Sequence, residues 1–305
     1  MFRARTRLIV PLVALAAASA LVLGASASAT TPWPTCLGQP ATIVGTPGND
    51  TINGTSGDDV IVGLGGDDVI TTGGSGDNGD VVCGGDGNDA IIVTGDSFFD
   101  YALVSGDAGD DRIQASRGTF AEVSYEDSPA PVTVDLGAGT ATGWGNDTLV
   151  NVSYLDGSPF DDTLTGSAGS DGIYGGPGND TINGGGGNDD LAGGPGNDTI
   201  DGDSGRDWVD YYDAPAGVHV SLAKGTASGG GGNDTFHAIE SIWGSKHSDV
   251  LIGNAGPNEL QGLAGNDRLY GERGKDTLVG GAGKDFADGG PARDVCRAEK
   301  KLHCP

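Results

Sequence analysis

The feature that most constrains this chain is a nine-residue repeat, which recurs in three blocks along the sequence. Each unit begins with glycine, carries aspartate at its sixth position and places a large aliphatic residue at its eighth. Six units without a gap start at Gly157 and read GSPFDDTLT, GSAGSDGIY, GGPGNDTIN, GGGGNDDLA, GGPGNDTID and GDSGRDWVD. Units this short cannot each enclose a core, so they must stack on one another.

The residue types within a unit predict a turn followed by a very short strand. The first six positions are turn formers whose glycines permit positive φ, and the aliphatic eighth residue points inward. These inward residues are Ile52, Ile61, Ile70, Ile91, Ile113, Leu164, Ile173, Ile182, Leu191, Ile200, Leu251, Leu260, Leu269 and Leu278. Two units then make one coil of strand, turn, strand and turn. The predicted fold is all-β: a parallel β-roll, which is a β-helix or solenoid.

The repeat blocks alternate with two longer units that align with each other after a single inserted residue. Alternation at Val132, Val134 and Leu136 predicts short strands in them. We expect these segments: signal peptide 1–29, N-terminal lead or cap 30–44, first repeat block 45–115, spacer unit 116–156, second repeat block 157–210, spacer unit 211–243, third repeat block 244–295 and C-terminal cap 296–305. The spacers continue or cap the stack, and their sequences indicate no chemistry of their own.

The composition argues for a thin fold that depends on a cation. The chain has 58 glycines, 6% aromatic residues and 43 acidic against 16 basic residues, giving a formal charge of −27. So little hydrophobic material with so much charge is typical of disorder, unless a bound cation neutralises the acid. Such a surface is a poor partner for nucleic acid, because phosphate binding needs a basic face.

The sixth-position aspartates recur on the same edge of the coil every eighteen residues, as Asp162, Asp180 and Asp198 illustrate. Neighbouring coils lie ~4.8 Å apart, so stacked carboxylates repel by ~1 kcal/mol in bulk water and by more in a partly dry site. A hard cation between coils reverses that sign. Calcium accepts irregular shells of carboxylate and carbonyl oxygens, whereas magnesium keeps a tight hydrated octahedron and zinc requires histidine or cysteine. The expected cofactor is therefore Ca2+, in multiple copies.

The repeat resembles the RTX, or hemolysin-type, calcium-binding nonapeptide family, and the resemblance covers about half of the chain as strict repeats. It implies a parallel β-roll with calcium in the turns. The matching metal ligands are Asp50, Asp59, Asp68, Asp89, Asp111, Asp162, Asp171, Asp180, Asp189, Asp198, Asp207, Asp249, Asp267, Asp276 and Asp285. Asn258 departs from the pattern and is expected to weaken its site. Many family members carry a C-terminal export signal and a catalytic domain, and this sequence shows neither pattern.

The N-terminus has the layout of a secretory signal peptide. Arg3, Arg5 and Arg7 precede an apolar run over 8–23, and two overlapping Ala-x-Ala sites follow within 25–29. Cleavage is favoured over an uncleaved membrane anchor, because the run is short and rich in alanine. We expect a secreted, extracellular mature chain that is not inserted in a membrane and whose charge is about −30.

Four cysteines suggest disulfides in an exported chain. Three pairings are possible, and we expect Cys36 with Cys83 and Cys296 with Cys304, because each pair then closes one end of the molecule.

A calcium-binding protein with a structural or interaction role, and no enzymatic activity, is the leading interpretation. Gly202–Gly205 resembles the nucleophile segment of serine proteases, but Ser204 is simply the third residue of a repeat, and no histidine segment completes a triad. A calcium-dependent adhesin with a cell-envelope or glycan partner is the alternative, in which Trp144, Trp208 and Trp243 contact the partner instead of packing in the spacers. The sequence does not determine the oligomeric state.

Overall fold

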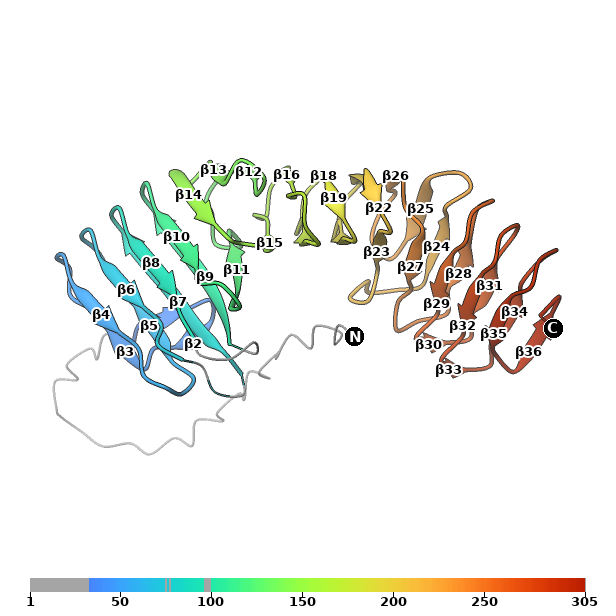
Figure 1. The fold of residues 1–305 in the computed structure, drawn as a ribbon, viewed down its shortest axis with the longest axis horizontal. Helices are drawn as coiled ribbons and strands as arrows, with labels where there is room; N and C mark the ends of the chain where they lie inside the picture. The colour runs from blue at the N-terminus through green and yellow to red at the C-terminus, as the bar shows by residue number, and fades with distance from the viewer. Residues whose placement is uncertain (1–32, 75, 77, 96–99, 305) are drawn as a thin grey trace, which may run out of the picture. The chain divides into compact units, whose positions relative to one another are not determined.

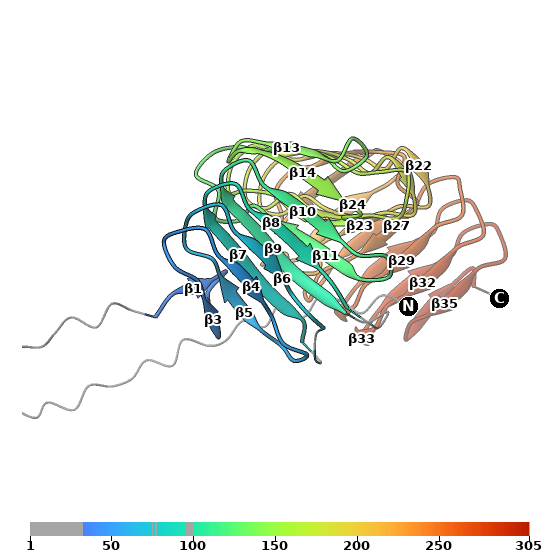
Figure 2. The ribbon, with the colours of Figure 1, turned by 60° about the vertical axis from the view of Figure 1, so that its left-hand side comes forward.

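The computed structural model describes residues 33–304 apart from Ser75, Asp77 and residues 96–99, and the chain from Trp33 onward forms one compact unit. The predicted signal peptide lies outside the described residues. The described part is all-β, as expected, and its strands lie side by side in stacked coils (Figures 1 and 2). None of the described residues belongs to a helix long and apolar enough to cross a membrane.

One face of the solenoid is a sheet of 13 parallel strands. Its order is β3 (Ile43–Val44), β5 (Val60–Val62), β7 (Asp80–Asp86), β9 (Tyr101–Ala108), β11 (Phe120–Ser124), β15 (Tyr154–Asp156), β17 (Gly172–Tyr174), β20 (Asp190–Ala192), β23 (Trp208–Asp210), β27 (Ser241–Trp243), β29 (Glu259–Gln261), β32 (Thr277–Val279) and β35 (Val295–Arg297). We call this face the first sheet.

The opposite face, the second sheet, is paired in a different order because both spacers fold back on themselves. Successive neighbours are β4 (Thr51–Asn53), β6 (Val69–Thr71), β8 (Ala90–Val93), β10 (Arg112–Ala115), β14 (Asn146–Val150), β13 (Thr140–Thr142), β12 (Thr133–Asp135), β16 (Thr163–Thr165), β18 (Thr181–Asn183), β21 (Thr199–Asp201), β26 (Thr235–His237), β25 (Thr226–Gly229), β24 (Val218–Ser221), β28 (Val250–Ile252), β31 (Arg268–Tyr270), β34 (Phe286–Asp288) and β36 (Lys300–Leu302).

Three short pairs complete the described strands. β1 (Thr35–Cys36) pairs with β2 (Gln39–Pro40) in antiparallel fashion. β19 (Gly186–Gly187) pairs with β22 (Ser204–Gly205), and β30 (Ala264–Gly265) pairs with β33 (Ala282–Gly283), both in parallel and both within repeat turns.

The strand register confirms that two nine-residue units make one coil. Leu164 lies opposite Ile182 and Ile182 opposite Ile200, so partners in the second sheet are eighteen residues apart. Ile173 and Leu191 repeat the same step in the first sheet. The eighth-position residues predicted to point inward are all buried, and most are fully so. Apolar side chains stacked on their neighbours in the coils above and below make the narrow core of the solenoid. Strands of the second and third blocks contribute one such side chain each, and β8 to β11 contribute two each.

Each spacer inserts an antiparallel meander into the second sheet only. In the first spacer, β10 pairs with β14 and β12 pairs with β16, with β13 between them (Figure 1). On the opposite face β11 pairs directly with β15. The second spacer repeats the arrangement with β24, β25 and β26, so each spacer adds two strands to one face and none to the other.

Both expected disulfides are confirmed. Cys36–Cys83 joins β1 to β7 across a sequence separation of 47, and Cys296–Cys304 joins β35 to the chain that follows β36. The first bond sits in a small satellite core with Ala41, Val62 and Val81. The disulfides therefore tie each end of the described chain to the nearest coils, where stacking neighbours are present on one side only.

The first prediction tests the narrow core. Leu191 is fully buried in β20, so Leu191→Ala should lower the free energy of unfolding in saturating calcium by about 2–5 kcal/mol. Val69 is 42% exposed, and Val69→Ala should cost less than about 1 kcal/mol. Urea unfolding followed by circular dichroism measures both. Equal losses would contradict a core made of the inward-facing residues.

Candidate metal centre

The sixth-position aspartates lie where each turn enters the next strand, and the fold buries them. Asp180 in the second block is 1% exposed and Asp189 on the opposite edge is fully buried. Every sequence-predicted ligand is buried except Asp50, which is half-buried in the first coil. Buried carboxylates are rare unless they are paired, hydrogen-bonded or bound to metal.

One oxygen of each carboxyl group is used by the backbone. The N–H of Asp162 donates to Oδ1 of Asp180 at 2.8 Å, and the N–H of Asp180 donates to Oδ1 of Asp198 at 2.9 Å. The same step joins Asp171 to Asp189 on the other edge. The first and third blocks repeat it, so the predicted residues form two columns, one along each edge of the solenoid.

A second, exposed ladder runs beside each column at the fifth position of the repeat. The side-chain oxygen of Asn179 accepts the backbone N–H of Asn197 at 3.0 Å, and that of Asp161 accepts the N–H of Asn179 at 2.7 Å. Asparagine serves as well as aspartate there, because only an acceptor oxygen is needed. The exposed ladder holds the turns in register without requiring charge.

The other carboxyl oxygen of the buried column has no hydrogen-bond partner. Among the described residues, buried side-chain oxygens of this kind occur at Oδ2 of Asp68, Asp89, Asp111, Asp180, Asp189, Asp198, Asp207, Asp267, Asp276, Asp285 and Asp294, and at Oδ1 of Asp171. An unsatisfied buried polar atom costs about 1–3 kcal/mol, and more when it is charged. An unpartnered carboxyl oxygen recurs at the equivalent place in successive turns, which is the arrangement that a repeated cation site requires.

Burial also raises the pKa of several carboxyl groups in the columns. It raises the pKa of Asp180, Asp189 and Asp198 to about 7, and the carboxylates of neighbouring coils add to the effect. The pKa of Asp111 rises to about 8 for the same two reasons. Backbone N–H donors oppose the shift without cancelling it. These four carboxyl groups therefore hold protons near neutral pH unless a cation takes the place of those protons.

The glycines of the turn bring backbone carbonyl oxygens to the same place. A Cβ atom on Gly175 would meet Oδ2 of Asp180 and lie 2.6 Å from the carbonyl oxygen of Gly193 in the next coil. Gly178 has φ of +150°, and a Cβ there would lie 2.9 Å from Oδ1 of Asp180. Only glycine fits at such approaches. Carboxylate and carbonyl oxygens thus converge around each turn.

This oxygen-only donor set fits calcium. No group of three or more His, Cys, Asp or Glu side chains converges among the residues described. A cation would therefore take a few carboxylate oxygens and complete its shell with turn carbonyls, as calcium readily does. The orphaned carboxyl oxygens are the observation that makes this fit specific.

The units that open each block differ from those that follow. Their second residue is Thr46, Thr55, Ser158, Ser167, Ser245 or Asn254. In each, the backbone N–H of that residue donates to the sixth-position side chain of its own turn, for example Ser167 to Oδ2 of Asp171 at 2.6 Å. In the later units the second residue has positive φ, as at Leu64 and Gly176. Opening turns thus satisfy one side-chain oxygen of their own sixth residue, although Oδ1 of Asp171 is still without a partner.

The sequence interpretation missed several column members in the spacers and at the ends. Asp80, Asp147, Asp234 and Glu299 each accept the backbone N–H of the preceding column residue. The four-residue string Gly-Asn-Asp-Thr within both spacers was the available signal for Asp147 and Asp234. It was hidden because their separation from the preceding member is 36 residues, twice the regular step.

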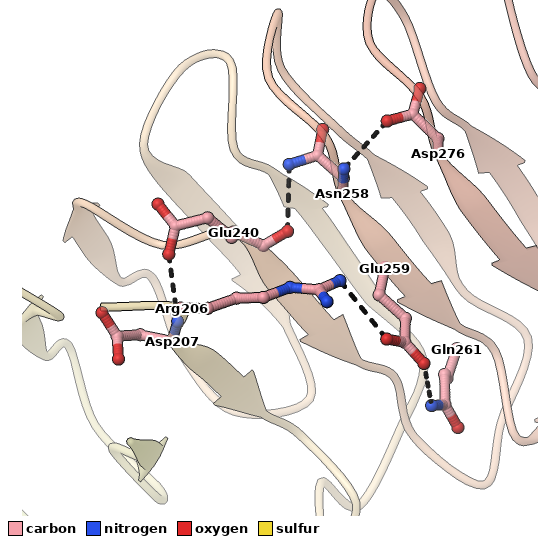
Figure 3. A network of polar contacts seen from close by, with 7 residues as sticks. All are labelled: Arg206, Asp207, Glu240, Asn258, Glu259, Gln261 and Asp276. Atoms are coloured by element: carbon pink, nitrogen blue, oxygen red, sulfur yellow. Dashed lines mark hydrogen bonds and ion pairs between the residues drawn. The ribbon is translucent and has the colours of Figure 1, made fainter. Parts of the chain in front are cut away.

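Asn258 makes one hydrogen bond that an aspartate could not make and keeps one that the aspartates of other opening turns also accept. Its Nδ2 donates to the backbone carbonyl of Glu240 at 2.9 Å and its Oδ1 accepts the N–H of Asn254 at 2.7 Å. The side chain of Glu240 in turn accepts the N–H of Asp207 (Figure 3). Glu240 therefore continues the column on this edge across the second spacer. The asparagine amide thus closes a position where a carboxylate would leave an oxygen unpaired.

The other sequence candidates lie on the outside of the coils. Ser204 is exposed in β22, and its hydroxyl donates to the carbonyl of Gly185 at 3.4 Å. Trp144 packs against the main core, whereas Trp208 and Trp243 contact each other on adjacent strands with ring centroids 5.3 Å apart.

The second prediction tests the close backbone approach that the turn glycines allow. Gly175→Ala should displace Asp180 or the Gly193 carbonyl, and should raise the calcium concentration needed for folding by about tenfold or more. A Cβ atom on Gly48 would meet nothing within 4 Å, so Gly48→Ala is the matched control and should leave that midpoint unchanged. Calcium titration followed by circular dichroism compares them. An unchanged calcium midpoint in Gly175→Ala would show that the turn can accommodate a Cβ atom at this position.

Seven segments of the chain match the RTX calcium-binding nonapeptide repeat (4 copies) family: residues 44–78, 103–119, 156–191, 183–211, 226–238, 243–278 and 273–299. The segment 226–238 falls within the second spacer and includes Asp234, which agrees with the place of that residue in the column. No curated protein matches the chain. The matched segments span more than half of the sequence, and the chain belongs to the RTX calcium-binding nonapeptide repeat family.

Proposed function

We propose that this chain is a secreted calcium-binding protein that folds when Ca2+ occupies the turns of its β-roll, and that its role is structural or interactive rather than catalytic. The proposed ligands are the buried sixth-position aspartates that have an unpartnered carboxyl oxygen, together with turn carbonyl oxygens. The single observation that carries the proposal is the recurrence of buried, unpartnered carboxyl oxygens along both edges.

The dependence of folding on calcium follows from what the metal-free chain lacks. The one or two inward-facing apolar residues of each strand provide a small hydrophobic driving force, while 58 glycines impose a large entropic cost on folding. Stacked buried carboxylates add repulsion. Calcium binding removes that repulsion and satisfies the orphaned oxygens, so its binding free energy becomes folding free energy.

Export fits the same chemistry. The leader sequence and the two disulfides are features of chains that mature in an oxidising compartment. Sites in the 10⁻⁴–10⁻³ M class would fill at extracellular calcium concentrations. The chain would then cross the membrane unfolded and fold outside the cell.

A calcium-dependent contact with a glycan or cell envelope is the second candidate function. Trp208 and Trp243 form a half-buried pair on the outer side of β23 and β27, opposite the inward Val209 and Ile242. Aromatic rings of this kind suit sugar faces. Binding of the calcium-loaded protein to purified envelope, with Trp243→Ala as the variant, separates this candidate from a purely structural role.

The third prediction tests the calcium columns. Asp180→Asn removes one buried charge and should raise the calcium concentration at the folding midpoint by about tenfold. Asp161→Asn is the matched control, because Asp161 is exposed at the fifth position, where asparagine already occurs in other units. At pH 8 the wild-type spectrum should become rich in strands with calcium, and neither excess chelator nor magnesium should support it. A strand spectrum that survives chelator at pH 8 in the reduced protein would refute calcium-dependent folding.

The fourth prediction concerns pH in the absence of calcium. The pKa of Asp180, Asp189 and Asp198 is about 7 in the folded chain against an ordinary 3.8, so between these values the folded state holds more protons than the unfolded state. The free energy of unfolding must then fall as pH rises through that window. In chelator, strand content should be greatest near pH 5 and should be lost towards pH 8.

Calcium should reverse that dependence, because it competes with protons for the same oxygens. The calcium concentration at the folding midpoint should therefore rise as pH falls below about 6. Circular dichroism in chelator over pH 5 to 8 measures the first effect, and calcium titrations at each pH measure the second. A metal-free protein that gains stability from pH 5 to pH 8 would contradict the burial of protonated carboxyl groups.

A further inference from the structure

Four buried aspartates at the two spacers differ from those inside the repeat blocks. Asp147 and Asp162 flank the first spacer meander, and Asp234 and Asp249 flank the second. They are 1–5% exposed, as deeply buried as the orphaned aspartates of the columns. Unlike those aspartates, all four have hydrogen-bond partners on both carboxyl oxygens.

A tyrosine hydroxyl closes the end of the column that enters each spacer. Tyr125 donates to Oδ2 of Asp147 at 2.8 Å, while the N–H of Asp111 donates to Oδ1. In the second spacer, Tyr211 donates to Oδ2 of Asp234 at 2.7 Å. The N–H of Asp198 donates to Oδ1 of Asp234 at 3.1 Å. Both tyrosines are themselves buried, at 3% and 7% exposure.

A serine closes the column that leaves each spacer. Ser158 donates its N–H to Oδ2 of Asp162 and its hydroxyl to Oδ1 at 2.7 Å, and Val132 adds its own N–H to Oδ1. Asp249 receives the same three bonds from the N–H and hydroxyl of Ser245 and from the N–H of Val218.

We propose that each spacer is a metal-free break in one calcium column, closed by Tyr125 and Ser158 in the first spacer and by Tyr211 and Ser245 in the second. The inference rests on the proposed function, because it divides the calcium sites into separate runs. Calcium then binds at the orphaned aspartates inside the blocks and not at Asp147, Asp162, Asp234 or Asp249.

The chemistry of the tyrosine contact supports a break rather than a further site. The phenol is a neutral donor that satisfies the carboxyl oxygen without bringing charge, and its ring fills space beside that oxygen. Burial and the adjacent carboxylate raise the pKa of Tyr211 well above its ordinary value, so the hydroxyl keeps its proton. Two spacers of different sequence contain the same pair at the same aligned position, which makes a chance contact a poor explanation.

The fifth prediction compares two aspartates of one column. Asp198→Asn removes an orphaned carboxylate and should lower the number of calcium ions bound at saturation by at least one. Asp234→Asn should leave that number unchanged, because the amide keeps an acceptor for the Asp198 N–H and can donate to the Tyr211 oxygen. Equilibrium dialysis of the whole mature chain against calcium measures both. A loss of bound calcium in Asp234→Asn equal to that in Asp198→Asn overturns the break.

Tyr211→Phe tests the hydroxyl itself. It should lower the melting temperature in saturating calcium by several degrees without reducing the number of bound ions. Tyr270→Phe, on the outer face against Phe286, should change neither quantity. An unchanged melting temperature in Tyr211→Phe would show that the hydroxyl does not close the column. If Asp234→Asn fails to fold, Asp147→Asn against Asp111→Asn gives the same comparison at the first spacer.

The outcomes also separate this inference from the proposed function. A wild-type chain that binds no calcium in dialysis refutes the proposed function as a whole. A wild-type chain that binds calcium, together with an Asp234→Asn variant that loses an ion, refutes only the metal-free break.

Discussion

The rest of the structure depends on the buried carboxyl oxygens of the sixth-position aspartates, which receive no hydrogen bond from the protein. Each interior sixth-position aspartate gives Oδ1 to the backbone of the preceding coil and leaves Oδ2 unpartnered, as at Asp180 and Asp198. Replacing these residues by apolar ones would remove the penalty but also one of the two side-chain ladders that hold the turns at a fixed spacing. The fold thus keeps a repeated energetic penalty, and binding of a hard cation at these oxygens would offset it.

The high glycine content follows from the need to bring backbone carbonyl oxygens close to these carboxyl oxygens. A carboxylate that shares a cation with the carbonyls of the next coil needs the two backbones in contact, and a side chain at Gly175 or Gly178 would keep them apart. The flexibility of glycine then makes the metal-free chain expensive to order. Close approach and calcium dependence are therefore two consequences of one requirement. The few larger residues with positive φ, such as Leu64 and Leu263, show that the turn conformation itself does not demand glycine at the second position.

The nine-residue pattern was sufficient to predict the inward residues and the two edges, because each depends on local geometry repeated at a fixed step. The disulfides were predicted separately, from an even number of cysteines placed near the two ends of the repeat array. It could not predict the partners of Asp147 and Asp234. Those partners, Tyr125 and Tyr211, lie 22 and 23 residues earlier and reach the column only after the meander has folded back. Glu240 was missed for a related reason, since a longer side chain reaches the column from a position outside the repeat. Periodicity describes coils of equal length, and the spacers are the places where the length changes.

At the spacers, the apolar stack and the carboxylate column of the solenoid behave differently. In the first sheet, inward residues stack without interruption across the first spacer, from Val123 to Leu155 to Ile173. On the second sheet the meander intervenes, and the carboxylate column stops at a tyrosine and starts again at a serine. Hydrophobic stacking is therefore continuous where the proposed ion columns are broken. A block that has folded around its ions presents a completed strand edge to the next block, so stability passes between blocks through the apolar face even though no ion bridges them.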